Sequence, residues 1–358
     1  MDSTPSTARS LGRYFMIDGD ELERAYKHHL SEYPTWEQKA HATDHILMPG
    51  NLGERLSIDE TALQEDLFTI LSNKAGHCCK GSIVAMVRGT KAPDVITHLM
   101  QLPEAERMRV REVTMDLSSS MRAIVSAVFP NATIVLDCFH ILKRCHDAIE
   151  EIRLKLKREA QAELRKQERE HRERQKRNAR QRRYYRKRHP RKPGEVRRGR
   201  KPKRKNERFK APTFDNGDTK IELLTRSKRA LTQSREKWSD NTKKRMNILF
   251  SEEPRLKEAY DIVNALRSIF RSKTLGKEEA RAKLQDWYQK ATDCTLREIK
   301  SARDAIKLRE DEVLNYFLER STNAGAESLN SKIKAFRSQL RGVSDLSFFM
   351  FRLYKIFG

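Results

Sequence analysis

The amino-acid sequence predicts an α/β protein in which a sheet-containing core is interrupted by a mainly α-helical insertion. Short runs with a β-type pattern fill residues 56–87, and two more, with a helix between them, fill residues 113–136. Beyond residue 140 the apolar positions follow the helical period almost to the end of the chain. With 358 residues, the chain is long enough for one large domain or two ordinary ones.

The first 53 residues are polar and predict a helical or irregular segment, with the best helix at residues 21–33. The first part of the core, residues 54–150, begins with three runs that predict an antiparallel meander. These runs are residues 56–60, 67–71 and 81–87. Pro93 stands where a first helical residue is favoured and predicts a helix over residues 94–102.

Residues 113–136 have the pattern of a strand, a helix and a second strand. The first strand ends on Asp116 and the second on Asp137. A turn of three serines at residues 118–120 caps a helix, and the apolar side chains after it recur at helical spacing: Met121, Ile124, Val125 and Val128. Because the strands of such a unit are parallel, both carboxylates are expected at one edge of the sheet. Three strands followed by alternating helices and strands is the order of an RNase H-like domain.

A strongly basic stretch follows the second of these strands. The formal net charge of the chain is +24, and residues 165–210 hold 24 Lys and Arg against 5 Asp and Glu. This charge predicts salt-sensitive binding of nucleic acid without sequence specificity. We expect one long helix over residues 141–188 and disorder over residues 191–210, where apolar side chains are almost absent. The candidate DNA contacts in this stretch are Arg182, Arg183, Lys187, Arg198 and Lys203.

Residues 151–319 predict the helical insertion, and residues 320–358 predict the helices that complete the core. The insertion holds two apolar stripes, one of Ile262, Leu266, Ile269 and Phe270, the other of Ile306, Val313, Leu314, Phe317 and Leu318. After residue 320 a third apolar face is formed by Ala326, Leu329, Ile333 and Phe336.

The cysteines and the lack of long apolar runs indicate in which cellular compartment the protein is expected. Five cysteines show neither zinc-binding spacing nor an even-numbered framework, which favours a reducing compartment. The sequence contains no export signal and no apolar run of membrane-spanning length. We therefore expect a cytoplasmic protein that has no membrane contact and is nucleoid-associated when bound to DNA.

Three acidic residues on separate elements are the candidate catalytic residues and metal ligands: Asp59, Asp116 and Glu327. Mg²⁺ takes oxygen ligands and is held by a few carboxylates, and a pair of such ions promotes displacement at phosphorus. Glu327 lies on a predicted helix with Asn330 and Lys334 on the same face, and these side chains suit a phosphate backbone.

Asp137 and His140 are accessory candidates, and each has two interpretations. Asp137 is either a fourth metal ligand or the cap of the helix that follows it. His140 either orders a carboxylate or contacts phosphate, or it is an ordinary core histidine. The sequence leaves both questions open.

Four stretches resemble the DDE transposases of bacterial insertion sequences, most closely the ISL-three group and its short relatives without an attached N-terminal DNA-binding module. They are LSIDE at residues 56–60, MD at 115–116, DCFH at 137–140 and RSTNAGAESLNSKIKAFR at 320–337. The resemblance implies an RNase H-like catalytic core interrupted by a helical insertion. It also implies an Asp-Asp-Glu triad at Asp59, Asp116 and Glu327 with two divalent metal ions, Mg²⁺ or Mn²⁺.

The function implied is cut-and-paste transposition, in which strands of double-stranded DNA are cleaved at the element ends and transferred to target DNA. The candidate backbone contacts beside the site are Arg320, Asn323, Asn330, Lys334, Arg337 and Arg341. Synapsis of two ends predicts self-association, and end recognition predicts a separately encoded N-terminal DNA-binding protein. Two alternatives remain, an RNase H-like nuclease or resolvase without strand transfer and a non-catalytic nucleic-acid-binding protein.

Overall fold

The computed structural model describes residues 1–63, 65–189 and 208–358. They form two compact units. The first unit comprises Met1–Lys143, Ile269–Asp286 and Asp304–Gly358, and the second comprises Arg144–Ser268 and Trp287–Arg303. The first 53 residues, predicted as a separate segment, lie within the first unit.

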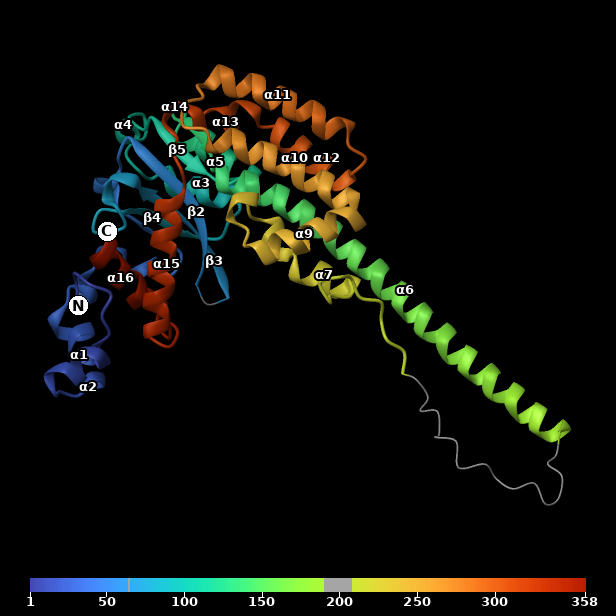
Figure 1. The fold of residues 1–358 in the computed structure, drawn as a ribbon. Coiled ribbons are helices and arrows are strands. Elements are labelled where there is room, and N and C mark those ends of the chain that lie inside the picture. The colour runs from blue at the N-terminus through green and yellow to red at the C-terminus, as the bar shows by residue number, and fades with distance from the viewer. Residues whose placement is uncertain (64, 190–207) are drawn as a thin grey trace. The chain divides into compact units, whose positions relative to one another are not determined.

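The first unit is built on one mixed sheet of six strands in the order β1-β4-β3-β2-β5-β6 (Figure 1). The strands are β1 (His45–Leu47), β2 (Arg55–Leu63), β3 (Asp66–Asn73), β4 (Ile83–Arg88), β5 (Glu112–Met115) and β6 (Thr133–Leu136). Strands β2, β3 and β4 form an antiparallel meander, and β5 and β6 continue the sheet parallel to β2. The predicted meander and the predicted parallel unit are therefore confirmed.

Strand β1 is the one element of the sheet that the sequence pattern did not predict. It pairs antiparallel with β4 at the edge of the sheet. Its three residues are too few to show the alternation that marks a half-buried strand. The helix predicted at residues 21–33 is shorter than expected, because α2 (Gly19–Ala25) continues only as a π-helical turn, Tyr26–Leu30.

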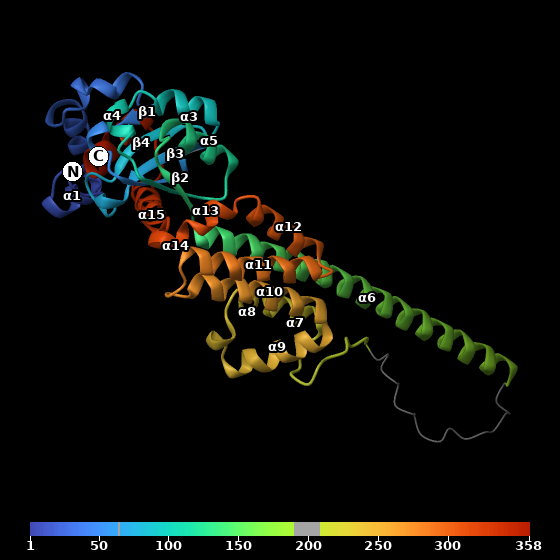
Figure 2. The same ribbon diagram turned by 90° about the horizontal axis from the view of Figure 1, so that it is seen from above.

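Helices cover both faces of the sheet (Figure 2). On one face, α3 (Ala92–Leu99) and α5 (Ser119–Val128) lie side by side. The Ser118 hydroxyl accepts a hydrogen bond from the Met121 amide at the start of α5, and the four predicted apolar positions of this helix are buried. The remaining short elements of this unit are α1 (Ala8–Phe15), α4 (Glu104–Arg107), α13 (Glu310–Leu314), α14 (Tyr316–Glu319) and the 3₁₀ turns Tyr33–Thr35, Glu37–Ala40, Pro49–Asn51 and Lys74–Gly76.

On the other face, α15 (Ala324–Gln339) and α16 (Leu346–Phe357) pack against β1, β3 and β4. The predicted apolar face of α15 is buried, and its Leu329, Ile333 and Phe336 lie in one core with Phe349 and Met350 of α16. The side chain of Asp345 caps α16 by accepting from the Phe348 amide at 2.9 Å. This packing places the beginning of α15 beside β2.

One predicted core residue is exposed. Leu318 was placed on an apolar stripe, but 56% of it is accessible to solvent. The reason is local. Helix α14 is only four residues long, and Arg320, which follows its last residue, has a left-handed backbone conformation with φ of 53°. The stripe therefore ends at Phe317, which is buried against Phe270 with ring centroids 5.6 Å apart.

The second unit is helical in its described residues. Its elements are α7 (Lys220–Arg226), α8 (Lys228–Leu231), α9 (Asp240–Glu252) and the 3₁₀ turn Arg235–Lys237, and it shares α6 (Cys138–Arg188), α10 (Pro254–Arg271), α11 (Lys277–Asp293) and α12 (Arg297–Lys307) with the first unit. Trp238 and Trp287 lie in its core, where their indole N–H groups donate to the carbonyls of Ala230 and Ile262.

The long basic helix predicted after the last strand is confirmed, since α6 runs for 51 residues. The predicted disorder over residues 191–210 falls mostly outside the described residues, as do Arg198 and Lys203. Among the helices of the described part, none combines the length and the apolarity needed to cross a membrane.

Candidate active site

Three aspartates stand at the same level of three neighbouring strands. The parallel register of β2 and β5 pairs Ser57 with Thr114, so two residues further along each strand Asp59 meets Asp116. The register of β5 and β6 pairs Met115 with Leu136, so the next step brings Asp116 beside Asp137. Neighbouring strands are separated by about 4.8 Å. The carboxyl ends of the parallel strands therefore collect negative charge at one place.

Asp59 is held by two hydrogen bonds. Its Oδ1 accepts from the amide of Glu60 at 2.8 Å, and its Oδ2 accepts from Nδ2 of Asn330 on α15 at 2.6 Å. Burial raises the pKa of the Asp59 carboxyl to about 6, and the charges of Asp116 and Glu327 act in the same direction. The Asp59 carboxyl is thus largely shielded from solvent and has two acidic neighbours.

His140, at the start of α6, joins the other two aspartates. Its Nδ1 lies 2.8 Å from Oδ1 of Asp116 and 3.2 Å from Oδ2 of Asp137. These two carboxylates raise the pKa of His140 to about 10, so the imidazole is cationic at neutral pH. Asp137 is 3% exposed and also accepts from the amide of Phe139 at 3.3 Å. It therefore caps α6 while its carboxylate lies among the possible metal ligands.

Helix α15 is fixed along β2 by three side chains spaced two turns apart. Asn323 donates to the carbonyl of Ile58 at 3.3 Å, Asn330 donates to Asp59, and Arg337 donates to the carbonyl of Ala62 at 3.4 Å. Glu327 lies between the first two, on the first turn of the helix, and is exposed. The bonds of Asn323 and Asn330 hold this turn beside Asp59, near enough for the Glu327 charge to act on it.

The sequence model of a family described as Transposase, the DDE transposases of the ISL-three group, matches residues 56–353. The match begins at the strand that carries Asp59, ends in α16, and includes Asp116 and Glu327. The chain belongs to this transposase family. The protein is therefore a DNA-processing enzyme, and its partner is DNA. No curated protein and no solved structure matches the chain.

The candidate DNA contacts near the site of this transposase differ in their exposure to solvent. Lys334 and Arg341 are exposed, whereas Asn323 and Asn330 are 0% and 5% exposed and bonded to β2. Arg320 donates to the carbonyl of Leu275 at 2.9 Å, and its guanidinium lies over the ring of Phe317. In the second unit, the basic side chains proposed on the described part of α6 are all exposed: Arg182, Arg183 and Lys187.

The donor atoms at the site suit a hard divalent cation. Asp116 Oδ1 is fully buried and, apart from its contact with His140, has no hydrogen-bond partner among the described residues. The amide oxygens of Asn323 and Asn330 are likewise buried without a described partner. Carboxylate and amide oxygens are the ligands that Mg²⁺ and Mn²⁺ prefer. The residues of the site therefore fit the predicted metal ions.

We expect Asp59→Asn to stabilise the metal-free transposase at neutral pH. The folded chain holds the Asp59 proton more tightly than the unfolded chain, whose carboxyl has a pKa near 3.8. The free energy of unfolding of the wild type therefore falls as pH rises between 3.8 and about 6. A neutral amide avoids this loss, which is at most about 3 kcal/mol. After a flip of the Asn330 amide, its free Oδ1 accepts from the new side chain.

The measurement is chemical unfolding in a chelator at a series of pH values. The wild type should lose stability across that window, and Asp59→Asn should not. Asp94→Asn, an exposed change on α3, is the control and should follow the wild type. Equal pH dependence in Asp59→Asn and the wild type would show that Asp59 is not the titrating group.

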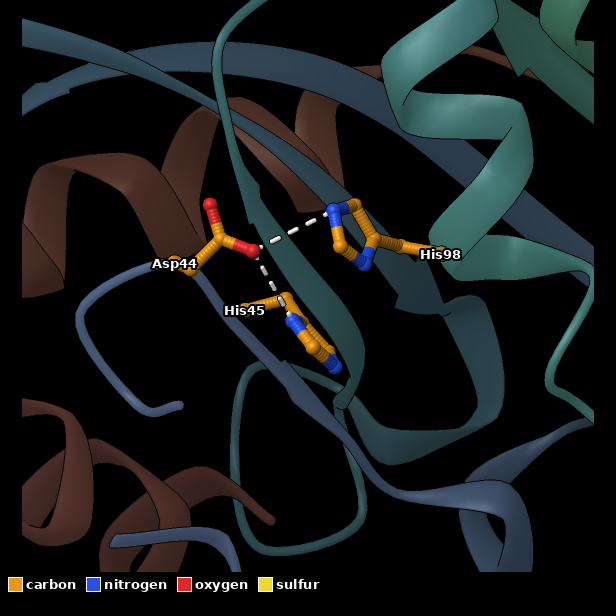
Figure 3. A group of neighbouring side chains, drawn as sticks. All are labelled: Asp44, His45 and His98. Atoms are coloured by element: carbon orange, nitrogen blue, oxygen red, sulfur yellow. Dashed lines mark hydrogen bonds and ion pairs between the residues drawn. The ribbon is translucent and has the colours of Figure 1, made fainter. Parts of the chain in front are cut away.

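A second group of ligand-type side chains was not predicted from the sequence. Asp44, His45 and His98 lie together at the edge of the sheet (Figure 3). The signal in the sequence is the spacing of His41, Asp44 and His45 at the start of β1. The third partner, His98, is more than fifty residues away in the chain, which is why the group could not be recognised from spacing.

Proposed function

We propose that this transposase cleaves DNA strands at the ends of its element and transfers them to target DNA, with Asp59, Asp116 and Glu327 as its catalytic residues. The observation that carries the proposal is the meeting of Asp59 and Asp116 at the ends of neighbouring strands, beside the helix that bears Glu327. Carboxylates that converge from separate elements are the arrangement that phosphoryl transfer with metal ions requires.

The proposed fold of the catalytic part is RNase H-like. Support comes from the order β4-β3-β2-β5-β6, in which an antiparallel meander is followed by two parallel strands, with β1 added at the edge. The mainly helical chain between β6 and α15 is then the insertion into this core. Such an insertion explains why Glu327 stands about 210 residues after Asp116 and still lies near Asp59.

We assign two divalent ions, Mg²⁺ or Mn²⁺, to the three catalytic carboxylates, with Asp137 as a further oxygen donor beside Asp116. When bound, the ions would activate the attacking oxygen and stabilise the leaving oxygen of an in-line displacement at phosphorus. Asp116 Oδ1, a buried oxygen whose close partner among the described residues is His140 Nδ1 at 2.8 Å, is the first atom we assign as a ligand.

The other residues of the site position these carboxylates. Asn330 fixes the orientation of Asp59, and Asn323 ties the start of α15 to β2. Both were predicted to contact DNA, but their burial favours a role as positioning residues. His140 holds a proton on Nδ1 between Asp116 and Asp137 and offsets part of the negative charge of the cluster.

The DNA-binding surface proposed for the first unit consists of the exposed residues of α15 and its C-terminal turn, with Lys334 and Arg341 as phosphate contacts. In the second unit, the basic part of α6 provides sequence-independent affinity. Self-association during synapsis and a separately encoded DNA-binding protein for end recognition complete the proposal. The latter is refuted if the purified chain alone binds the terminal repeats specifically.

We expect Glu327→Gln to abolish strand cleavage and to leave DNA binding unchanged. The amide removes one negative charge from the site but keeps the size of the side chain, and Glu327 is exposed, so the fold should tolerate the change. Nicking of DNA that carries an element end measures cleavage, and a gel-shift titration measures binding. Glu104→Gln, an exposed change on α4, is the control. Loss of both cleavage and binding in Glu327→Gln would assign a structural role to Glu327.

A further inference from the structure

Two histidines and one aspartate meet where strand β1 faces helix α3 (Figure 3). Oδ2 of Asp44 lies 3.2 Å from Nδ1 of His45 and 3.2 Å from Nε2 of His98. The three ligand atoms all lie within 4.8 Å of one another. Both ring nitrogens are turned towards the same carboxylate, as Figure 3 shows.

We propose that Asp44, His45 and His98 form a binding site for a divalent transition-metal ion, with Zn²⁺ as the best match. Imidazole nitrogens favour zinc and its neighbours in the periodic table, whereas Mg²⁺ prefers oxygen ligands. Two histidines and one carboxylate supply three protein ligands for zinc, and water fills the fourth position of such a site.

The backbone around the ligands is well fixed. His45 pairs with Val87 of β4, and the amide of Arg88 donates to the carbonyl of Asp44 at 2.7 Å. His98 lies in the last turn of α3, which is packed on β4. Two of the ligands therefore stand on regular elements, and the backbone of the third is bonded to a strand. A site on such elements is pre-organised for an ion.

The fourth side chain of the group, His41, orients His45. Its ring stacks on the His45 ring with centroids 4.2 Å apart and planes 13° apart, and its Nδ1 lies 3.0 Å from the His45 carbonyl. These two contacts hold the His45 imidazole in place, with its Nδ1 facing Asp44.

Asp44 is the ligand that can adjust. Its side chain is 55% exposed, while those of His45 and His98 are 10% and 21% exposed. A movement of this carboxylate away from the ring nitrogens would open the space between them for an ion. The same two contacts are also those of a carboxylate that is hydrogen-bonded to two histidines without an ion, and uptake of Zn²⁺ distinguishes the two arrangements.

This site is distinct from the catalytic carboxylates in position and in chemistry. Strands β4 and β3 lie between β1 and β2, so the two sites are separated by three strand spacings, about 14 Å. The consequence of metal binding is structural, because the ion would fasten the short edge strand β1 to helix α3. The inference is independent of the proposed strand-transfer chemistry.

The experiment uses the full-length, untagged chain with Asp116→Asn, which disables the carboxylate site. We expect this protein to bind a single equivalent of Zn²⁺ in excess Mg²⁺, and to give with Co²⁺ the visible absorption of a tetrahedral nitrogen and oxygen site. Adding His98→Gln should lower Zn²⁺ affinity at least about tenfold, since even the partners that orient ligands contribute that much. His28→Gln, at an exposed histidine in another part of the first unit, should leave Zn²⁺ affinity unchanged.

Asp44→Asn is the second variant, because its exposed side chain can be changed with little risk to folding. It should also lower Zn²⁺ affinity, and thermal unfolding in a chelator should match that of the parent protein. Two results would overturn the proposal: no Zn²⁺ uptake by the parent, which leaves an Asp–His hydrogen-bond pair, or undiminished uptake in both ligand variants. Neither result bears on cleavage of DNA by the wild type in Mg²⁺.

Discussion

Asp116→Asn is expected to reduce strand cleavage and strand transfer at least about a thousandfold. Asp116 stands between Asp59 and Asp137 at the end of the central strand of the three, and its buried Oδ1 lies 2.8 Å from His140 Nδ1. The amide cannot supply a second negative oxygen, so the affinity of the site for divalent ions falls. Thermal unfolding measured with and without Mg²⁺ reports this loss, because ligands of the folded state raise the unfolding temperature.

The control for this prediction is a thiolate at the same position. Asp116→Cys offers a softer ligand, which favours Mn²⁺ over Mg²⁺ relative to the wild type. Partial activity of Asp116→Cys in Mn²⁺ and none in Mg²⁺ would show that Asp116 binds the ion directly. Full activity of Asp116→Asn in Mg²⁺ would remove Asp116 from the set of catalytic residues.

Replacement of Arg182, Arg183 and Lys187 by glutamine should lower DNA affinity about ten- to a hundredfold at physiological salt. All three side chains are exposed on α6, and within the described part of the chain none of them forms an ion pair with an acidic side chain. If each contacts one phosphate, the slope of log affinity against log salt should decrease by about 2.7. Binding titrations at several salt concentrations measure both quantities.

A charge-preserving variant separates charge from helix structure in this experiment. Arg182→Lys with Arg183→Lys keeps the positive charge of the helix and its helical propensity. Its affinity should stay within a fewfold of the wild type with the same salt slope. An unchanged affinity in the glutamine variant would exclude this part of α6 from the DNA-binding surface.

The strands, and the aspartates that stand at their ends, could be predicted because the signals for them are local in the sequence. Apolar runs of strand length end directly before Asp116 and Asp137, and a strand-type run includes Asp59. Because the strands are parallel and in register, residues at the ends of neighbouring strands also lie next to one another in the folded sheet. Strand β1 gave no such signal, because three residues cannot display a period.

The contacts that complete the site could not be predicted, because they join distant parts of the chain. Asn330 bonds to Asp59 across 271 residues, and its burial follows from the packing of α15 on the sheet. The amide pattern on α15 was interpreted as a DNA-binding face, since an exposed and a buried asparagine look the same in sequence. His140 was recognised as a candidate, but only the structure shows that it lies between two carboxylates.

Joining of pre-cleaved element ends to a target plasmid by the purified protein in Mg²⁺ is the most direct test of the central claim. It bypasses the first cleavage and separates a transposase from a nuclease of the same fold. We predict joined products with the wild type and none with Asp59→Asn, Asp116→Asn or Glu327→Gln. A wild type that binds these ends and cleaves DNA but never joins it would contradict strand transfer, and joining by any of the three variants would contradict the proposed site.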